Sequence, residues 1–361
     1  MRQNKYSDFK IVAFPEKLRS FAEGKISAPI YVRVKPINLC DHSCFFCCYS
    51  TGFRKGDRDN HIHSGMHEDM HERDVMPTSK MMEVLEDFRD IGVKAVTYSG
   101  GGEPLLHRDI VEIMQRTLDY GIDLSIITNG QMLVKRRAAV LAHAKWVRVS
   151  IDYTDGAQMA ASRNVPSQHF DMIMANLENF ARIKDKSCDL AVNYIIHREN
   201  YKGIAAFAKQ LKDCGVENVR FSPMWNPDFV AYHAPIAEKV REQLAYAANL
   251  VDDNFNMNTT YKIDAAAHSP KRSYHKCLFM QTVPVVGADQ VVYACHNKAY
   301  DKSGVIGSIK NRRFRDLWFS DEAKAVFEGL DPAVSCRHQC ANDQKNILIH
   351  QMLDASTDNF V

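Results

Sequence analysis

The chain of 361 residues has no long apolar run and almost no excess of charge. No stretch approaches the roughly 18 apolar residues that a membrane span needs. Residues 1–10 are polar, so they do not resemble a secretory signal peptide. A formal net charge of +2 gives no reason to expect nucleic acid or a membrane surface as a partner. We found no repeats or low-complexity tracts, and these absences together predict a cytoplasmic globular protein.

Cysteine, by contrast, is plentiful, with ten residues. In a chain without a secretion signal, ten cysteines are not expected to form a disulfide framework. Cys188 and Cys214 are isolated and are expected to be buried or incidental thiols. The other eight form one group at residues 40–48 and another at residues 277–340. Two groups of thiols in a reducing compartment indicate metal binding.

Between residues 31 and 221, apolar runs typical of strands alternate with amphipathic segments typical of helices. About six such βα units follow one another, which predicts a parallel sheet with outer helices. Six units are too few for the closed eight-stranded barrel. We therefore expect an α/β fold, a partial (β/α)6 barrel, with functional residues at the carboxyl ends of the strands.

The pattern changes after residue 221, which suggests a division into four parts. We expect an N-terminal extension at 1–29, the barrel domain at 30–228 and a connecting helix or linker at 229–276. Residues 277–361 are expected to form a small domain with a β-hairpin, signalled by Gly287-Ala288-Asp289, and a helix over 314–330.

The most informative motif is the loop that carries Cys40, Cys44 and Cys47 directly after the first strand. Three thiolates are one fewer than a closed zinc site or a [4Fe–4S] cluster requires, so a cluster held here keeps one iron open for a small molecule. A zinc knuckle completed by Cys48 or a histidine is the alternative. We expect Cys48 to be a spectator that packs as a small hydrophobe.

A second motif, Ser99-Gly100-Gly101-Gly102-Glu103-Pro104, ends the second predicted strand. Its glycines allow the backbone to approach a ligand closely, and Glu103 is able to accept hydrogen bonds from an ammonium group. An ordinary strand-to-helix turn is the alternative.

The two motifs, in this order, resemble those of the radical S-adenosylmethionine (SAM) enzymes over residues 31–221. The resemblance implies that Cys40, Cys44 and Cys47 hold a [4Fe–4S] cluster whose fourth iron binds SAM. Reductive cleavage of SAM would give a 5′-deoxyadenosyl radical that removes a hydrogen atom from the substrate. A flavodoxin or ferredoxin is the expected electron donor.

The resemblance also assigns residues to SAM. Phe46 would lie against the adenine, and Gly101, Gly102 and Glu103 would receive the amino group. The further contacts that it implies are Asn129, Ser150, Asp152, Arg163 and Asn193. For Asn129 and Asp152, plain turn chemistry is the alternative.

The second cysteine group consists of Cys277, Cys295, Cys336 and Cys340, four thiols from separate segments. Such a set suits a closed metal or cluster site, and a zinc ribbon is one alternative. The group resembles the twitch form of the SPASM extension, which implies one auxiliary [4Fe–4S] cluster. Such a cluster has no open iron, so we expect it to transfer electrons.

Three functions remain open. The first choice is a radical SAM oxidoreductase that dehydrogenates a small-molecule alcohol or amine. The second is a maturase that crosslinks, epimerises or oxidises a ribosomally made peptide. Only 39 residues precede Cys40, too few for a fused peptide-recognition domain, which favours the small molecule. The third is a non-catalytic zinc-binding protein.

The base that takes the substrate's proton is not identified. Tyr293, Arg163 and the acidic side chains Glu68, Asp69 and Asp74 are the candidates. The last three belong to a histidine-rich segment, residues 52–77, which is either a solvated loop or a lid over the cofactor.

Overall fold

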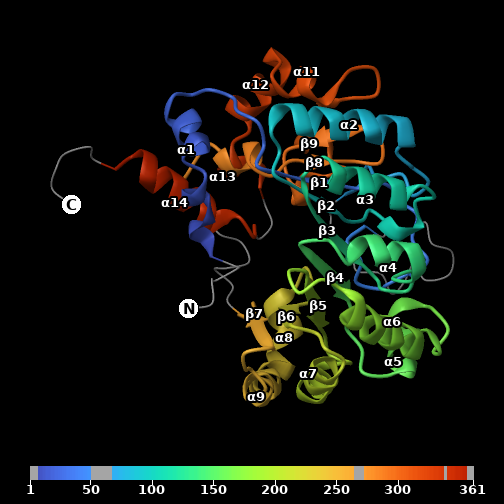
Figure 1. Cartoon of the computed structure of the whole chain (residues 1–361). Coiled ribbons are helices and arrows are strands. Elements are labelled where there is room, and N and C mark those ends of the chain that lie inside the picture. Colours follow the sequence, from blue (N-terminus) through green and yellow to red (C-terminus); the bar gives the residue numbers. More distant parts are fainter. Residues whose placement is uncertain (1–6, 50–66, 264–271, 337–339, 356–361) are drawn as a thin grey trace.

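A computed structural model describes residues 7–49, 67–263, 272–336 and 340–355, and its strands form one continuous sheet (Figure 1). The strand order is β10-β9-β8-β1-β2-β3-β4-β5-β6-β7. Strands β1 to β6 run parallel, as predicted for the barrel, and β7 pairs parallel with β6. The strands are β1 Tyr31–Val34, β2 Ala95–Tyr98, β3 Asp123–Thr128, β4 Trp146–Ser150, β5 Asp189–Ile196, β6 Asn218–Pro223, β7 Asn256–Thr259, β8 Val285–Val286, β9 Val291–Tyr293 and β10 Val305–Ser308.

Helices cover the outer face of the sheet, on the side where α2, α3, α4 and α6 appear in Figure 1. The longer helices are α1 Pro15–Ala22, α2 Thr78–Ile91, α3 Ile110–Asp119, α4 Lys135–Leu141, α5 Gly156–Arg163, α6 His169–Ile183, α7 Ile204–Asp213, α9 Ala237–Ala248, α12 Asp321–Gly329 and α14 Asp343–Leu353. The shorter ones are α8 Phe229–His233, α11 Phe314–Trp318 and α13 Pro332–Ser335.

The core lies between the strands and these helices. Val32 and Val34 of β1 are fully buried and pack with Leu85 and Phe88 of α2, whereas Tyr31 and Arg33 of the same strand stay partly exposed. This alternation follows from the two-residue period of a strand. Burying one such side chain contributes roughly 1.5–3 kcal/mol. The hydrophobic pattern therefore fixes which face of each strand meets the helices.

From the sequence, the helix after the first cysteine group is expected to be capped by Thr78 and to end at Gly92. Gly92 ends the helix with φ of 84°, a left-handed conformation that favours glycine. Thr78 does not cap the start. It is the first helical residue, Pro77 occupies the cap position, and the Thr78 hydroxyl donates to Asp109 Oδ2 at 2.5 Å.

The C-terminal region differs from the sequence-based expectation in three ways. Strand β8 of the predicted hairpin pairs parallel with β1, so the hairpin extends the main sheet. Strand β7 adds a parallel strand from within residues 229–276. The helix expected over residues 314–330 is two helices, because Ser320 caps α12 and accepts a hydrogen bond from Ala323 N.

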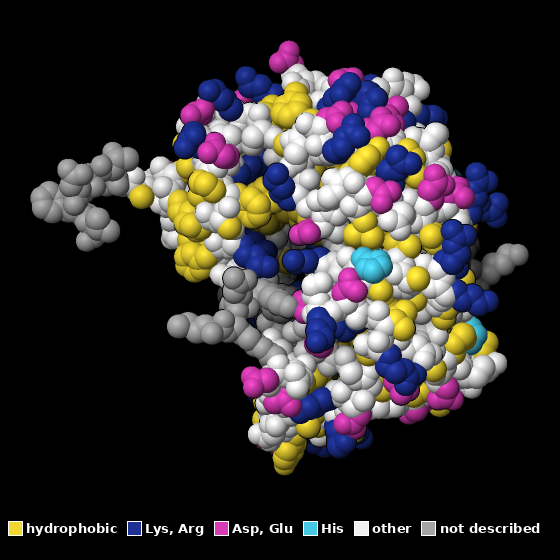
Figure 2. All heavy atoms as spheres, in the orientation of Figure 1, with side chains coloured by type: hydrophobic (Ala, Val, Ile, Leu, Met, Phe, Trp, Pro, Cys, Tyr) yellow, Lys and Arg dark blue, Asp and Glu magenta, His cyan; other side chains and the backbone are white. Residues whose placement is uncertain are grey.

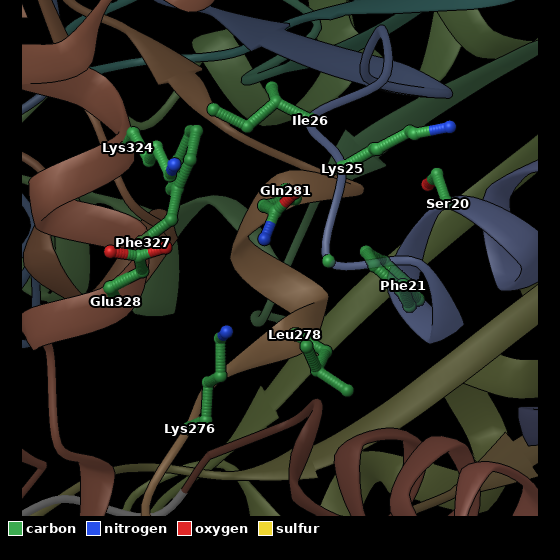
Figure 3. Close-up of a pocket in the computed structure, with 11 residues that line it drawn as sticks. Ser20, Phe21, Lys25, Ile26, Lys276, Leu278, Gln281, Lys324, Phe327 and Glu328 are labelled. Atoms are coloured by element: carbon green, nitrogen blue, oxygen red, sulfur yellow. The ribbon is translucent and has the colours of Figure 1, made fainter.

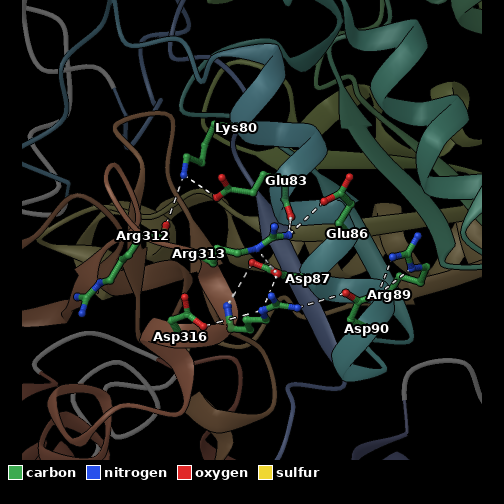
Figure 4. A network of polar contacts seen from close by, with 10 residues as sticks. Lys80, Glu83, Glu86, Asp87, Arg89, Asp90, Arg312, Arg313 and Asp316 are labelled. Carbon is green, nitrogen blue, oxygen red and sulfur yellow. Dashed lines mark hydrogen bonds and ion pairs between the residues drawn. The ribbon is translucent and has the colours of Figure 1, made fainter.

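The C-terminal region is fastened to the barrel by an ion-pair cluster between α2 and α11 (Figure 4). Asp87 of α2 is fully buried and pairs with Arg313 at 2.8 Å and with Arg315 at 3.4 Å. Glu86 adds a more exposed contact to Arg313 at 3.2 Å. The arginines come from the start of α11, so the cluster joins segments more than 200 residues apart in the chain.

On the face shown in Figure 2, apolar side chains gather around α1 and α14, and charges of both signs are mixed elsewhere. Phe9 and Val12, just before α1, are among the most exposed large apolar residues. None of the described helices is both long and apolar enough to cross a membrane.

Candidate functional site

The cysteine loop is held on one side by the glycine turn. Gly102 N donates to Ile37 O and Glu103 N donates to Leu39 O, at 3.1 and 2.8 Å. A Cβ atom on Gly101 would lie 1.9 Å from Asn38 Oδ1, and one on Gly102 would lie 1.9 Å from Leu39 O. Both positions therefore exclude side chains, because the segment that leads into the loop packs directly on the turn.

The other side of the loop is held by the end of α5. Ser43 N donates to Arg163 O at 2.9 Å, and Phe45 N donates to Ser162 O at 3.2 Å. These contacts bring α5, which the sequence analysis did not identify, into the site. They fix the loop backbone between its first and last cysteine.

Residues that follow β3 provide a third anchor. Asn129 Nδ2 donates to Asp41 Oδ1 at 2.6 Å, and Gln131 Oε1 lies 3.0 Å from His42 Nε2. Burial, followed by the nearby Arg163 charge, lowers the pKa of His42 to about 4. Asn129, predicted as a SAM contact, therefore has its amide engaged with the cysteine loop.

Cys40, Cys44 and Cys47 are all partly exposed. Cys44 lies close enough to Arg163 for the two charges to interact. Cys48 packs beside Tyr49, and burial, with Cys47 nearby, raises the pKa of its thiol to about 12. A thiol of that kind suits the spectator role predicted for Cys48.

Glu103 connects the ends of two strands. It is 2% exposed and accepts hydrogen bonds from Asn129 N and Thr128 Oγ1, both at 2.7 Å, and from Leu105 N at 3.0 Å. Burial raises its pKa to about 7, although the three donors oppose the shift. The carboxyl group therefore has a structural role in this arrangement.

Asp152 and Arg163 form a buried pair. Arg163 Nε and Nη2 both donate to Asp152 Oδ1, at 2.9 and 2.5 Å. Asp152 Oδ2 is buried and has no hydrogen-bond partner among the described residues. The guanidinium also lies over Phe46, with 5.9 Å to the ring centroid. The structure thus brings three of the predicted SAM contacts together and leaves one carboxylate oxygen available to a ligand.

His197, which the sequence analysis missed, lies beside Phe46. It follows β5, and its ring centroid is 6.1 Å from that of Phe46. Burial lowers the pKa of its imidazole, which favours the neutral form. Its Nδ1 accepts from Glu199 N, while Nε2 has no hydrogen-bond partner among the described residues. The sequence offered one signal for His197: it directly follows a predicted strand, as Asn129 directly follows β3.

Ser150 and Asn193 are register partners on β4 and β5, and both are half-buried. They lie on the face of the sheet that the helices do not cover, as the strand alternation requires.

The four C-terminal cysteines also come together, although they belong to separate segments. The charges of Cys295 and Cys340 raise the pKa of Cys277, the charge of Cys340 raises that of Cys295, and Cys336 interacts with Cys295 and Cys340. Burial is the larger cause, and it raises the pKa of Cys277 and Cys295 to about 12.

Donors and cations surround this group, which fits a site that must hold thiolates. Asn346, in α14, is 1% exposed and donates through Nδ2 to Cys277 Sγ at 3.4 Å. Asn342 N donates to Cys340 Sγ at 3.4 Å. The positive charges that interact with the four thiols are those of Arg33, Arg272, Lys298 and Lys345.

The described part of the chain contains no group of three His, Cys, Asp or Glu side chains close enough to hold a single metal ion. A cubane cluster spaces its thiolates more widely than one zinc ion does. The thiols of the second group interact electrostatically, and four cysteines are a donor set that suits a closed metal or cluster site.

A hydrogen-bonded chain runs between the two cysteine groups. Lys35 Nζ donates to Gly100 O at 2.6 Å and to Tyr49 Oη at 2.7 Å. Tyr49 Oη lies 3.2 Å from Nδ1 of His296, the residue after Cys295. Burial lowers the pKa of Lys35 to about 7. The contacts link the glycine turn, the cysteine loop and the second group.

The described part of the histidine-rich segment packs on the C-terminal region. His67 Nδ1 lies 2.5 Å from Ala299 O, and Asp69 Oδ2 accepts from Lys302 N at 3.0 Å. Residues 52–66 of the segment, with His61 and His63, lie outside the described residues. Tyr293, a candidate proton acceptor, donates to Asp289 Oδ2 at 2.5 Å.

A small cavity of about 20 Å³ lies elsewhere, between α1 and α12 (Figure 3). Lys276, Lys324 and Gln281 line it, and none of the cysteines does. It is therefore separate from the candidate site.

Sequence comparison places this arrangement among known proteins. Residues 34–211 match the family described as the Radical SAM superfamily. A relative named PqqA peptide cyclase, from Bradyrhizobium diazoefficiens, is 25% identical over 185 residues, which are 51% of this chain and 43% of the relative. The PqqA peptide cyclase of Xanthomonas campestris pv. campestris is 23% identical over 270 residues, 71% of this chain and 69% of the relative.

Among solved structures, Streptococcus suis SuiB bound to the precursor peptide SuiA has a TM-score of 0.62 and 14% sequence identity. The match covers 97% of this chain and 80% of SuiB. This likeness establishes the fold, a partial barrel with a C-terminal extension.

Proposed function

We propose that this chain, which belongs to the radical SAM superfamily and has a SPASM/twitch-type C-terminal domain, modifies a ribosomally made peptide. The observation that carries the proposal is the similarity to PqqA peptide cyclases, which reaches over 71% of this chain. It supports the peptide alternative over the small-molecule dehydrogenation that was the first choice. The fold shared with SuiB, solved with its precursor peptide, agrees.

In this proposal Cys40, Cys44 and Cys47 hold the first [4Fe–4S] cluster. Held by these three thiolates with one iron open, such a cluster would supply the electron for reductive cleavage of SAM and so the radical chemistry that acts on the peptide. The loop has anchors in the glycine turn, in α5 and after β3, so its thiols are held in place before any cofactor binds. Fixed ligands reduce the ordering cost of binding.

The chain's own groups then bind SAM. Phe46 and the neutral His197 offer an aromatic surface and an open ring nitrogen, and Asp152 Oδ2 is a free acceptor beside them. Gly101 and Gly102 keep side chains away from the loop. Glu103, Asn129, Ser150, Arg163 and Asn193 complete the proposed surroundings.

Cys277, Cys295, Cys336 and Cys340 are proposed to hold an auxiliary [4Fe–4S] cluster, which would supply an electron acceptor inside the protein. A flavodoxin or ferredoxin remains the proposed donor to the first cluster. The hydrogen-bonded chain through Lys35, Tyr49 and His296 connects the two cysteine groups. It therefore supports a functional connection between the two proposed clusters.

Co-expression with a short peptide encoded beside the gene tests the proposal. We expect the mass of the peptide to fall by two hydrogen atoms for each crosslink or oxidation, and Cys40→Ala to prevent the change. Cys188→Ala, a buried thiol far from both groups in the sequence, is the matched control. An unmodified peptide, together with dehydrogenation of a small alcohol or amine by the purified protein, would contradict the peptide assignment.

A further inference from the structure

One side chain of α14 contacts a sulfur of the proposed auxiliary site. Asn346 Nδ2 donates to Cys277 Sγ at 3.4 Å. The same nitrogen donates to Asn342 O, one helical turn earlier, at 3.5 Å. Asn346 is 1% exposed, so water does not compete for either contact. A buried amide therefore directs one of its N–H groups at the sulfur of a proposed cluster ligand.

The orientation of this amide is set by the backbone rather than by the sulfur. Asn346 Oδ1 accepts a hydrogen bond from Phe279 N at 2.9 Å. A backbone N–H only donates, so this contact determines which end of the amide faces Cys277. Phe279 lies two residues after Cys277, in the short 3-10 helix Leu278–Gln281. The donor is therefore oriented before a cluster binds.

Two further contacts hold α14 along the segment that carries the contacted cysteine. Asp343, in the first turn of the helix, accepts from Tyr274 Oη at 2.5 Å. In the last turn, His350 Nε2 lies 2.8 Å from Lys276 O. Asp343, Asn346 and His350 share one face of the helix, because they are three and four positions apart. The amide of Asn346 is thus held between two anchored turns of the same helix.

A hydrogen bond to a ligand sulfur acts on the reduction potential of an iron–sulfur cluster. The reduced cluster carries one more negative charge than the oxidised cluster, and its sulfurs share that charge. A fixed N–H donor stabilises the more negative sulfur more strongly, because hydrogen bonds to charged groups are stronger than neutral ones. A donor at this position therefore makes the uptake of one electron more favourable.

We propose that Asn346 is a positioning residue that acts through Cys277 and raises the reduction potential of the auxiliary [4Fe–4S] cluster. This role rests on the proposed function, in which four cysteines hold that cluster, and it adds how the chain adjusts the cluster to accept an electron. A structural role alone, in which Asn346 only joins α14 to Phe279, is the alternative that the experiment separates.

Redox titration of the reconstituted full-length protein, followed by electron paramagnetic resonance without oxygen, measures this potential. Dithionite and mediator dyes supply the one electron that each cluster takes up. Cys40→Ala removes the first cluster, so its spectrum identifies the auxiliary signal. We expect Asn346→Leu to lower the ratio of reduced to oxidised auxiliary cluster roughly tenfold at the wild-type midpoint, a shift of about 59 mV for a one-electron couple.

A second variant, Asn346→Asp, keeps the shape of the side chain and the acceptor for Phe279 N. It replaces the N–H donor by a carboxylate oxygen, so we expect it to lower the potential at least as far as Asn346→Leu does. Both variants should retain about eight irons. If both lost the auxiliary iron, the role of Asn346 would be structural and the proposal would be wrong.

The matched control is Ile349→Ala. Ile349 is fully buried in α14, one turn after Asn346, and belongs to the same apolar cluster as Leu278. Its truncation loosens the packing of the helix and leaves the amide in place. The auxiliary potential of this variant should equal that of the wild type, and the potential of the first cluster should be the same in all three variants.

An auxiliary potential that stays constant in both Asn346 variants would overturn the proposal. An equal shift in Ile349→Ala would do the same, because looser packing of α14 would then explain the change. The titration needs neither SAM nor a peptide. A shifted potential with an unmodified peptide would therefore remove only the proposed function, whereas an unshifted potential with a modified peptide would remove only the role of Asn346.

Discussion

At the scale of single residues, the site depends on side chains that hold other protein groups. Glu103 accepts three hydrogen bonds from residues 105, 128 and 129, and Asn129 binds Asp41. The resemblance assigned both residues to SAM. Their contacts show that each also joins the cysteine loop or the glycine turn to a neighbouring strand. Substituting either is therefore expected to disturb the loop even before a cofactor binds.

Glu103 makes folding stability depend on pH. Its pKa is about 7 in the folded protein, against a model-peptide value of 4.5, with burial as the main cause. Because the pKa is raised, its stabilising contribution is complete below pH 4.5 and is lost as pH rises to about 7. Ionisation is expected to cost up to about 3 kcal/mol.

Chemical denaturation of the wild type and of Glu103→Gln at pH 4.5 and 7.5 measures this effect. The free energy of unfolding of the wild type should fall relative to that of the variant as pH rises. Glu112→Gln, at an exposed position of α3, is the control and should follow the wild type. Parallel curves for the wild type and Glu103→Gln would show that the carboxyl group titrates normally.

At the scale of elements, the attachment of α11 to α2 depends on one buried carboxylate. Asp87 pairs with Arg313 and Arg315, whereas Glu86, a neighbour in the same cluster, is 44% exposed (Figure 4). Removing the charge of Asp87 leaves two arginines without their buried partner. A buried charged contact is worth more than an exposed one.

We expect Asp87→Asn to lower the free energy of unfolding by about 1–3 kcal/mol, and Glu86→Gln to lower it by less than about 1 kcal/mol. Both substitutions keep the size of the side chain. Midpoints of urea unfolding give the comparison. If the two variants were equally stable, the buried pair would not be what fastens the C-terminal region.

At the scale of the whole molecule, the hydrogen-bonded chain through Lys35, Tyr49 and His296 connects the two cysteine groups. Reconstituted wild-type protein should contain about eight irons, and Cys40→Ala or Cys277→Ala about four each, because each group is proposed to hold one cubane. Cys48→Ala should keep about eight. Iron analysis and the visible spectrum measure the result. A colourless protein that contains two zinc ions would support the zinc-binding alternative.

Much of the site followed from the sequence alone. The spacing of Cys40, Cys44 and Cys47, the glycine turn and the alternation of strands and helices are local patterns, and each is set by neighbours in the chain. They were sufficient for the partial barrel, for its parallel order and for the superfamily. The end of α2 at Gly92 could also be predicted, because a helix often ends at a glycine, which readily adopts the left-handed φ observed there.

Only the tertiary structure decided the rest, because it depends on contacts between distant segments. The pairing of β8 with β1, the Asp152–Arg163 pair beside Phe46, and the position of His197 have no signature in local spacing.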